Sequence, residues 1–190
     1  DSTNPRTVIV SQDSVFSANF AVNVYTVTAT SNNASMGMVT GGGTYPYLAT
    51  AELSATAYYG HRFVQWSDGS TVNPRTLQVV SDTAFTAYFI PNTYTVTVVS
   101  NDTNMGSVFG GGTYNHGATA TLSATAAYGY HFVQWSDGNT DNPRILTVTT
   151  NATYTAQFAL NTYTLTALSN NSTMGTVLGG GTYPHNTPVY

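Results

Sequence analysis

Residues 129–138 read Gly-Tyr-His-Phe-Val-Gln-Trp-Ser-Asp-Gly, and residues 60–69 read Gly-His-Arg-Phe-Val-Gln-Trp-Ser-Asp-Gly. Each stretch holds one of the chain's two tryptophans and is followed by Asn-Pro-Arg, at residues 142–144 and 73–75. The offset in the sequence is constant, since 135 − 66 = 69 for the tryptophans and 144 − 75 = 69 for the arginines. Self-similarity at a fixed period indicates a tandem-repeat protein.

This period divides the 190 residues into two complete copies and two partial ones. The Asn-Pro-Arg at residues 4–6 and Phe20 precede their counterparts at 73–75 and 89 by the same offset, so the chain opens on the rear part of a repeat. We therefore expect a window from a longer array. The expected pieces are residues 1–21, 22–90, 91–159 and 160–190.

Within a repeat, apolar residues alternate with threonine, which is the period of a strand rather than of a helix. Residues 118–126, Ala-Thr-Ala-Thr-Leu-Ser-Ala-Thr-Ala, are rich in alanine, yet their threonines fall on one face only if the segment is extended. The glycine triplets, such as residues 110–112, predict a tight turn or bulge between strands. They are not phosphate loops, because no Gly-Lys-Ser/Thr follows them. The six short strands expected in the second copy are at about 94–100, 106–111, 118–126, 130–136, 144–149 and 153–158.

The predicted fold is all-β: small tandem domains of about 69 residues, sandwich-like or β-grasp-like without a clear helix, in an extended rod. A unit of this size has a marginal core, and the absence of cysteine excludes disulfides, so neighbouring repeats should stabilise one another. The links at residues 90–93 and 159–162 are short and begin with an apolar pair, which we expect to be buried between repeats. A semi-rigid rod rising by about 30–40 Å per repeat follows.

Composition excludes two classes of partner. Charged residues make up 6% of the chain, lysine is absent and the net charge is −4, which argues against nucleic-acid binding. No apolar run approaches the ~20 residues of a membrane span. Few sites for trypsin-like proteases remain, which suits an exposed extracellular protein.

The motifs Gly-Gly-Gly-Thr-Tyr, Phe-x-x-Trp-Ser-Asp-Gly, Asn-Pro-Arg and Tyr-Thr-Ala-Gln-Phe follow in that order at residues 110–114, 132–138, 142–144 and 154–158. This series resembles the divergent internalin-type B-repeats of bacterial surface proteins, over essentially the whole chain. The resemblance implies tandem extracellular domains that space a functional tip from the cell, often in adhesins. It also implies a β-grasp fold with a helix, although no segment here has a helical pattern. The family has no catalytic residues to transfer.

Trp66 and Trp135 are the leading candidates for a ligand site, as platforms on which a glycan ring stacks. The alternative is that they anchor the small core beside Phe63 and Phe132, and the scarcity of other large core residues favours this interpretation.

Metal sites have weaker support. The loop at residues 137–141, Asp-Gly-Asn-Thr-Asp, has the oxygen ligands that calcium prefers, but residues 68–72 lack the second carboxylate, so a turn is favoured. The four histidines occupy mostly unmatched positions, and only His185 repeats His116; we predict surface histidines. Met36, Met105 and Met174 are predicted to plug the core. We expect no catalytic, cofactor or metal site.

One modification is a further hypothesis. Asp13-Ser14-Val15 and Asp82-Thr83-Ala84 occupy the same repeat position and resemble an O-glycosylation signal that some Gram-negative bacteria use. Ser14 and Thr83 are the candidate acceptors, and an ordinary hairpin turn is the alternative.

The sequence thus favours a non-catalytic stalk or spacer of a bacterial cell-surface or secreted adhesin-like protein, whose partners are the neighbouring repeats. If strands 94–100 and 153–158 pair in shear geometry, the array also bears tension. One alternative is a multivalent array that binds a surface glycan or host protein, with repetition supplying avidity. The other is self-association into an extracellular filament through β edges that lack lysine.

Overall fold

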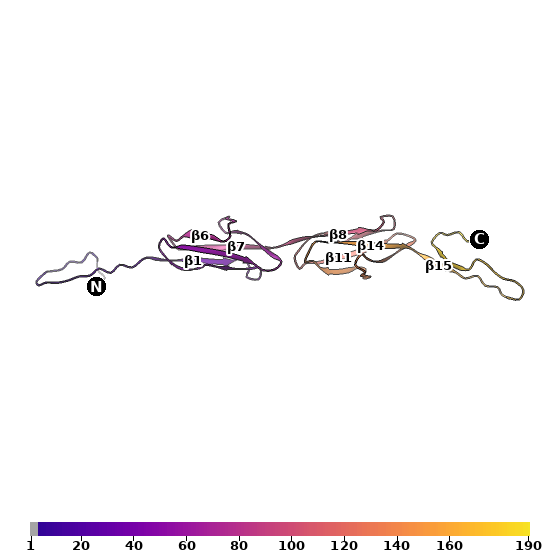
Figure 1. The fold of residues 1–190 in the computed structure, drawn as a ribbon, viewed down its shortest axis with the longest axis horizontal. Helices are drawn as coiled ribbons and strands as arrows, with labels where there is room; N and C mark the ends of the chain where they lie inside the picture. Colours follow the sequence, from indigo (N-terminus) through magenta and orange to yellow (C-terminus); the bar gives the residue numbers. More distant parts are fainter. Residues whose placement is uncertain (1–3) are drawn as a thin grey trace.

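The computed structural model describes residues 4–190, and the secondary structure in that range consists of strands, with no helix. Two seven-stranded repeats follow one another along the long axis of an extended molecule (Figure 1). The first repeat comprises β1 (Val24–Ser31), β2 (Gly37–Thr40), β3 (Gly43–Pro46), β4 (Thr50–Ala57), β5 (His61–Trp66), β6 (Arg75–Gln78) and β7 (Thr83–Pro91). The second comprises β8 (Thr93–Ser100), β9 (Gly106–Phe109), β10 (Gly112–Asn115), β11 (Thr119–Ala126), β12 (Tyr130–Trp135), β13 (Arg144–Thr147) and β14 (Ala152–Leu160). A hairpin of β15 (Thr162–Leu165) and β16 (Gly181–Pro184) follows.

Each repeat is a sandwich of two sheets. In the first repeat a four-stranded sheet, in the order β3-β1-β7-β5, faces a three-stranded sheet, in the order β2-β4-β6. The second repeat has the same arrangement, with the orders β10-β8-β14-β12 and β13-β11-β9. Neighbouring strands are antiparallel except for β1 with β7 and β8 with β14, which are parallel. The first and last strands of each repeat therefore lie side by side at the centre of the larger sheet. The all-β tandem organisation predicted from the sequence is confirmed.

The core of each repeat lies between its two sheets. In β11 the side chains of Ala120, Leu122 and Ala124 are buried, whereas Thr119 and Thr121 are exposed. The alternation of apolar residues with threonine thus places one face of each strand in the core and the other in solvent. The second core comprises Val96, Ala120, Leu122, Ala124, Trp135, Val148, Ala156 and Phe158, and the first contains the equivalent residues.

The prediction of six strands per repeat is wrong by one. The extra strand, β10, follows β9 after only Gly110 and Gly111, and the sequence pattern merges it with the glycine turn. Gly110 has a φ of 98°, and this left-handed conformation lets the chain leave the three-stranded sheet and enter the four-stranded one within two residues. A switch between sheets leaves the apolar period unchanged, so the sequence pattern does not reveal it.

Asparagine side chains hold the loops to the sheets by pairing as a backbone would. Asn142 accepts a hydrogen bond from the Ala124 N–H (2.9 Å) and donates to the Ala124 carbonyl (2.6 Å). The Asn101 side chain likewise accepts a hydrogen bond from the Phe158 N–H (3.0 Å) and donates one to the Phe158 carbonyl (3.2 Å). The first repeat has both arrangements, with Asn73 on Ala55 and Asn32 on Phe89. Each residue bonded in this way pairs with a neighbouring strand on one side, and the asparagine satisfies its backbone groups on the other side.

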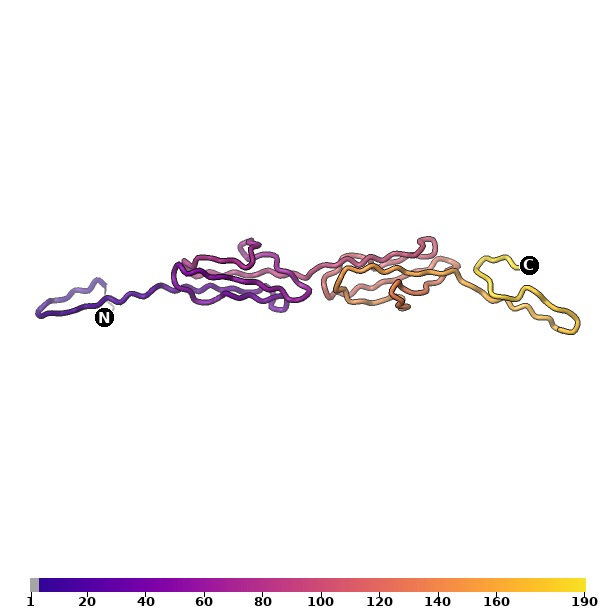
Figure 2. Tube along the Cα trace, viewed as in Figure 1, coloured from indigo at the N-terminus to yellow at the C-terminus, as the bar shows by residue number. Residues whose placement is uncertain are grey.

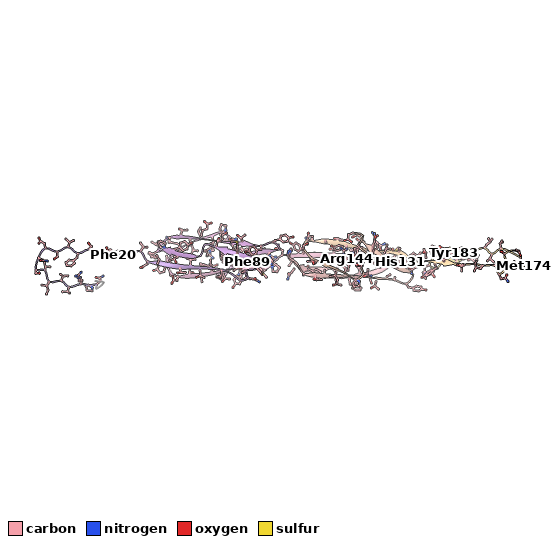
Figure 3. The ribbon with its side chains drawn as sticks, turned by 90° about the horizontal axis from the view of Figure 1, so that it is seen from below. Phe20, Phe89, His131, Arg144, Met174 and Tyr183 are labelled. Carbon is pink, nitrogen blue, oxygen red and sulfur yellow. The ribbon has the colours of Figure 1, made fainter. Side chains whose placement is uncertain are left out.

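The partial copies at the two ends have no closed core. Residues 4–23 contain no strand, and Phe20 is 94% exposed although its counterpart Phe89 is buried. Figure 3 shows Phe20 on the extended N-terminal segment and Phe89 within the first repeat. Likewise Met36 and Met105 pack against the two cores, as predicted, whereas Met174 is 84% exposed. The prediction fails for Met174 because a single hairpin has no opposite sheet to cover it.

Candidate functional site at the joints between repeats

The two tryptophans lie entirely within the cores, each with 0% of its surface exposed. Each indole Nε1 donates a 2.9 Å hydrogen bond to a backbone carbonyl of the following loop, that of Val72 or Asp141. The rings of Phe63 and Phe132 cover them at centroid distances of 5.5 and 5.3 Å. The burial agrees with the core-anchor interpretation of Trp66 and Trp135. As glycan platforms they have no ring face open to solvent.

The aspartates of the Ser-Asp-Gly turns form ion pairs with the arginines of Asn-Pro-Arg. Arg144 Nη1 lies 2.6 Å from Asp137 Oδ1, and Arg75 Nη1 lies 2.7 Å from Asp68 Oδ2. The hydrogen bond from the arginine is the largest cause of the lowered pKa of each aspartate. Each guanidinium also lies over an aromatic ring of the last strand, Arg144 over Tyr154 and Arg75 over Phe85, at 4.6 and 4.5 Å. The first carboxylate of the suspected calcium loop therefore closes the loop against its own repeat.

No group of three or more potential metal-binding side chains occurs among residues 4–190. The same part of the chain contains no helix long and apolar enough to cross a membrane.

The two candidate acceptors for O-glycosylation have different surroundings. Thr83 is the first residue of β7 and is half-buried, and the preceding Asp82 accepts a 2.7 Å hydrogen bond from the Thr26 N–H. Ser14 is exposed in the N-terminal segment and donates to the Gln12 carbonyl at 3.1 Å. Modification at Ser14 and Thr83 stays a prediction.

The links between repeats are much shorter than the repeats themselves. β7 ends at Pro91 and β8 begins at Thr93, so Asn92 alone separates them, and Asn161 alone separates β14 from β15. The chain passes from the first repeat to the second as an almost continuous strand (Figure 2). Neither of these two boundaries therefore has room for a flexible linker.

Backbone hydrogen bonds tie each linking asparagine to the repeat on either side. The Asn92 N–H donates to the Gly60 carbonyl (2.8 Å), and the Asn92 carbonyl accepts from the His116 N–H (2.7 Å). We call Gly60, Asn92 and His116 the first joint. Gly129, Asn161 and His185 form the second joint through the same two bonds, at 2.8 Å each. The ladders of consecutive repeats are thereby joined into one.

The histidine ring of each joint packs on a glycine that has no room for a side chain. Gly60 is buried with a φ of 80°, and a Cβ at this position would overlap the ring of His116. Gly129 has a φ of 87° and the same relation to His185. The ring of one repeat thus occupies the space that a side chain would fill on the repeat before it.

Tyrosines from both repeats contact the histidine ring. In the first joint, Tyr59 and Tyr94 lie at centroid distances of 4.8 and 5.9 Å from His116. In the second, Tyr128 and Tyr163 lie 4.9 and 6.0 Å from His185. One tyrosine of each pair precedes the joint glycine, and the other lies on the first strand of the following repeat.

A polar side chain of the preceding repeat bonds the link beside each joint. Arg62 donates to the Pro91 carbonyl at 3.0 Å in the first joint. His131, at the equivalent position, is bonded through Nδ1 to Asn161 Oδ1 at 2.8 Å in the second. Figure 3 shows His131 in the part of the second repeat that faces the terminal hairpin and Tyr183.

Two expectations about these residues are wrong. His116 and His185 are half-buried within the joints rather than being surface histidines. The apolar pairs of the links are not buried between repeats, since Ile90 and Leu160 are each 38% exposed. Backbone bonds and a ring seated on glycine connect the repeats instead. The signal in the sequence is the recurrence of histidine at position 185 and of Tyr-Gly at 59–60 and 128–129.

The family model described as the divergent InlB B-repeat domain matches residues 25–93 and 94–162, which is more than half of the chain. The chain belongs to this family, whose repeats occur in bacterial surface proteins. Both matches begin three residues after the expected starts at 22 and 91. No curated protein and no solved structure matches the chain.

Proposed function

We propose that these repeats form a stiff, tension-bearing and non-catalytic spacer of a bacterial surface or secreted adhesin-like protein. The observation that carries the proposal is the ladder of backbone hydrogen bonds that continues through both joints. A repeat array with this connection transmits orientation as well as length from one unit to the next.

Stiffness follows from what bending would break. Rotation about Asn92 separates its N–H from Gly60 or its carbonyl from His116, and it lifts the histidine ring off the glycine. Each joint therefore resists bending with two backbone bonds and with the packing of the histidine ring on the preceding repeat, although its linker is a single residue. The second joint has the same contacts even though a hairpin alone follows it, so the local residues are sufficient to form it.

Resistance to tension follows from the parallel pairing of the first and last strands. β8 and β14 pair from Val96 with Ala152 to Ser100 with Ala156. Pulling on the array draws the start of β8 and the end of β14 in opposite directions along the strands. All hydrogen bonds of the pair are then loaded together, whereas in a peeling geometry they would break one after another.

The accessible chemistry supports a spacer rather than a binding array. The two tryptophans are in the cores, and the outward positions of the central strands are mainly threonines, such as Thr95 and Thr97. The most exposed tyrosines of the two complete repeats, Tyr59 and Tyr128, lie beside the joints and pack against His116 and His185. The family contributes no catalytic residues, and its members are repeat modules of surface proteins.

A matched pair of glycine substitutions tests the proposal by small-angle X-ray scattering. Gly60→Ala places a methyl group against the His116 ring, and Gly69→Ala imposes the same backbone strain, at a φ of 84° against 80°, with no atom within 4 Å. Both variants should lose about 1 kcal/mol of stability from the positive φ. The unmodified chain and Gly69→Ala should share one maximum dimension, whereas Gly60→Ala should be shorter and more heterogeneous.

Two results would count against the spacer. If the unmodified chain scatters as beads on a flexible string, the joints do not hold the repeats in line. If scattering shows concentration-dependent lateral assembly, the filament alternative gains the support that the spacer loses.

A further inference from the structure

All four histidines of the chain lie in or beside the two joints. His116 is part of the first joint and His61 lies beside it, while His185 is part of the second joint and His131 lies beside it. The rings of His61 and His116 are 6.4 Å apart, and the His61 Nδ1 contacts the Tyr59 carbonyl at 3.0 Å. Histidine is the side chain that changes charge between about pH 5 and pH 8. The placement concentrates the titratable groups of that range where the repeats meet.

One ring nitrogen of each joint histidine is buried without a hydrogen-bond partner, Nδ1 in His116 and Nε2 in His185. In a neutral ring one nitrogen carries no hydrogen, so the unpartnered nitrogen leaves no N–H donor without an acceptor. Protonation makes both nitrogens donors and adds a positive charge, and the buried N–H then has no acceptor. In the docked geometry, no group of residues 4–190 lies in position to accept a hydrogen bond from that second N–H.

The groups that face these rings offer no compensating negative charge. Around His116 they are Tyr59 and His61 from the preceding repeat and Tyr94 from β8, while Arg62 bonds the linker beside it. Around His185 they are Tyr128 and Tyr163, with His131 on the linker. In the described chain, no carboxylate contacts either ring. Protonation of these histidines would place like charges together at each joint, and like charges oppose docking.

We propose that the joints are pH-sensitive hinges: protonation of the joint histidines releases the rings from Gly60 and Gly129, and the stiff rod becomes a flexible chain of intact repeats. The inference rests on the proposed spacer function, since it begins from a docked joint. Acidification would shorten the mean reach of the array and free the strand ends at each boundary. Neutralisation would restore it.

The chain itself supplies residues for a matched variant that does not titrate in this range. Tyr130 stands at the position of His61, and Tyr47 stands at the position of His116. Tyr47 packs against Tyr25 at 6.2 Å, much as His116 packs against Tyr94 at 5.9 Å. The double substitution His61→Tyr with His116→Tyr therefore removes both imidazole rings at the first joint and replaces them with residues that occur at the equivalent positions of other repeats.

Pulsed electron paramagnetic resonance on the whole chain tests the hinge. Thr71 and Thr140 are exposed, equivalent positions on either side of the first joint, and cysteine is otherwise absent, so Thr71→Cys and Thr140→Cys accept spin labels selectively. The distance distribution between labels should be narrow at about pH 8 and broader by about twofold or more at about pH 5.5. In the His61→Tyr/His116→Tyr background it should stay narrow at both pH values. Fluorescence of the buried tryptophans should show folded repeats throughout.

Each outcome separates the hinge from the spacer. A distribution that is narrow at both pH values in the native sequence overturns the hinge and leaves the spacer intact. Equal broadening in the tyrosine variant also overturns the hinge, because groups other than the histidines then open the joint. A distribution already broad at about pH 8 overturns the spacer, and the hinge with it. If the tyrosine variant fails to fold, nuclear magnetic resonance of the native chain is the alternative test. The His116 ring should then titrate over the same pH range in which the distance distribution broadens, and different pH ranges would overturn the hinge.

Discussion

Each buried tryptophan fixes the loop that follows it as well as filling the core. The Trp135 ring packs with Phe132, its Nε1 bonds the Asp141 carbonyl, and its backbone N–H bonds the Asn139 carbonyl at 2.8 Å. The loop so held presents Asp137 to Arg144. At the scale of single residues, one side chain thus joins core packing to the ion pair that closes the sandwich.

Truncation of the tryptophan should unfold its own repeat before the other. Trp135→Ala removes the largest buried side chain of the second core, and we expect a loss of about 3–5 kcal/mol in the unfolding free energy of that repeat. Urea unfolding followed by circular dichroism measures the loss, while Trp66 fluorescence reports on the first repeat. Ile145→Ala, at an exposed position of β13, should change stability by less than about 0.5 kcal/mol. Equal losses in the two variants would contradict the core role.

The two ion pairs should give a defined dependence of stability on acid. Because the bond from arginine lowers the pKa of Asp68 and Asp137 in the folded state, each pair stabilises the fold above the ordinary aspartate pKa. This stabilisation is lost as the pH falls from about 4 through the lowered pKa. The double variant Asp68→Asn/Asp137→Asn should melt at a lower temperature at pH 7 and lose less on acidification. Melting curves of Glu52→Gln, an exposed carboxylate of β4, should follow the unmodified chain; a double variant that did the same would refute the role of the pairs.

At the scale of elements, the parallel pairs of first and last strands separate this sandwich from a simple meander. β1 with β7 and β8 with β14 are neighbours, although they stand at opposite ends of the sequence of a repeat. The antiparallel partners β3 and β5, or β10 and β12, flank them on either side. The strands through which force enters and leaves a repeat are therefore both central and directly bonded.

Proline in this pair should weaken the repeat under load more than proline at a sheet edge. Thr97 is exposed on β8 and pairs with Thr153 of β14, so Thr97→Pro disrupts the central ladder. Thr147 is exposed on the edge strand β13. The neighbouring Val148 N–H bonds the Ala118 carbonyl, so the Thr147 N–H points away from the sheet. A proline at position 147 should therefore be tolerated. Single-molecule stretching should give a lower unfolding force for Thr97→Pro and a nearly unchanged one for Thr147→Pro. Unchanged forces in both would show that the parallel pair does not resist the pull.

At the scale of the whole molecule, length comes from repetition and direction comes from the joints. Both joints have the same bonds, with donor–acceptor distances of 2.7 to 2.8 Å, so each added repeat is set in the same relation to the one before it. The repeats line up along one axis in Figure 1.

An additional repeat should lengthen the rod by a constant increment. Chains with one or two extra copies of residues 91–159 should gain about 30–40 Å in maximum dimension per copy at neutral pH. X-ray scattering measures the gain, and a chain carrying Gly→Ala at every joint glycine serves as the flexible control. Growth with the square root of the repeat number in the unmodified series would exclude a stiff rod.

The sequence by itself determined the period, the strand character and the core of this protein. The sequence alone contains the constant offset between repeats, the threonine alternation and the Phe-x-x-Trp spacing. The alternation of apolar and polar residues along a strand predicts which of its faces is buried. The tertiary structure decided which strands pair and how the repeats join. Gly60 and His116 belong to different repeats, and neither is part of an apolar period. The two residues meet because β7 and β8 are joined through Asn92 alone, which places the end of one repeat against the start of the next. Gly60 has no side chain, so the His116 ring fits against it. The contact between Gly60 and His116 forms only when two folded repeats are docked, so the residue pattern within one repeat does not predict it.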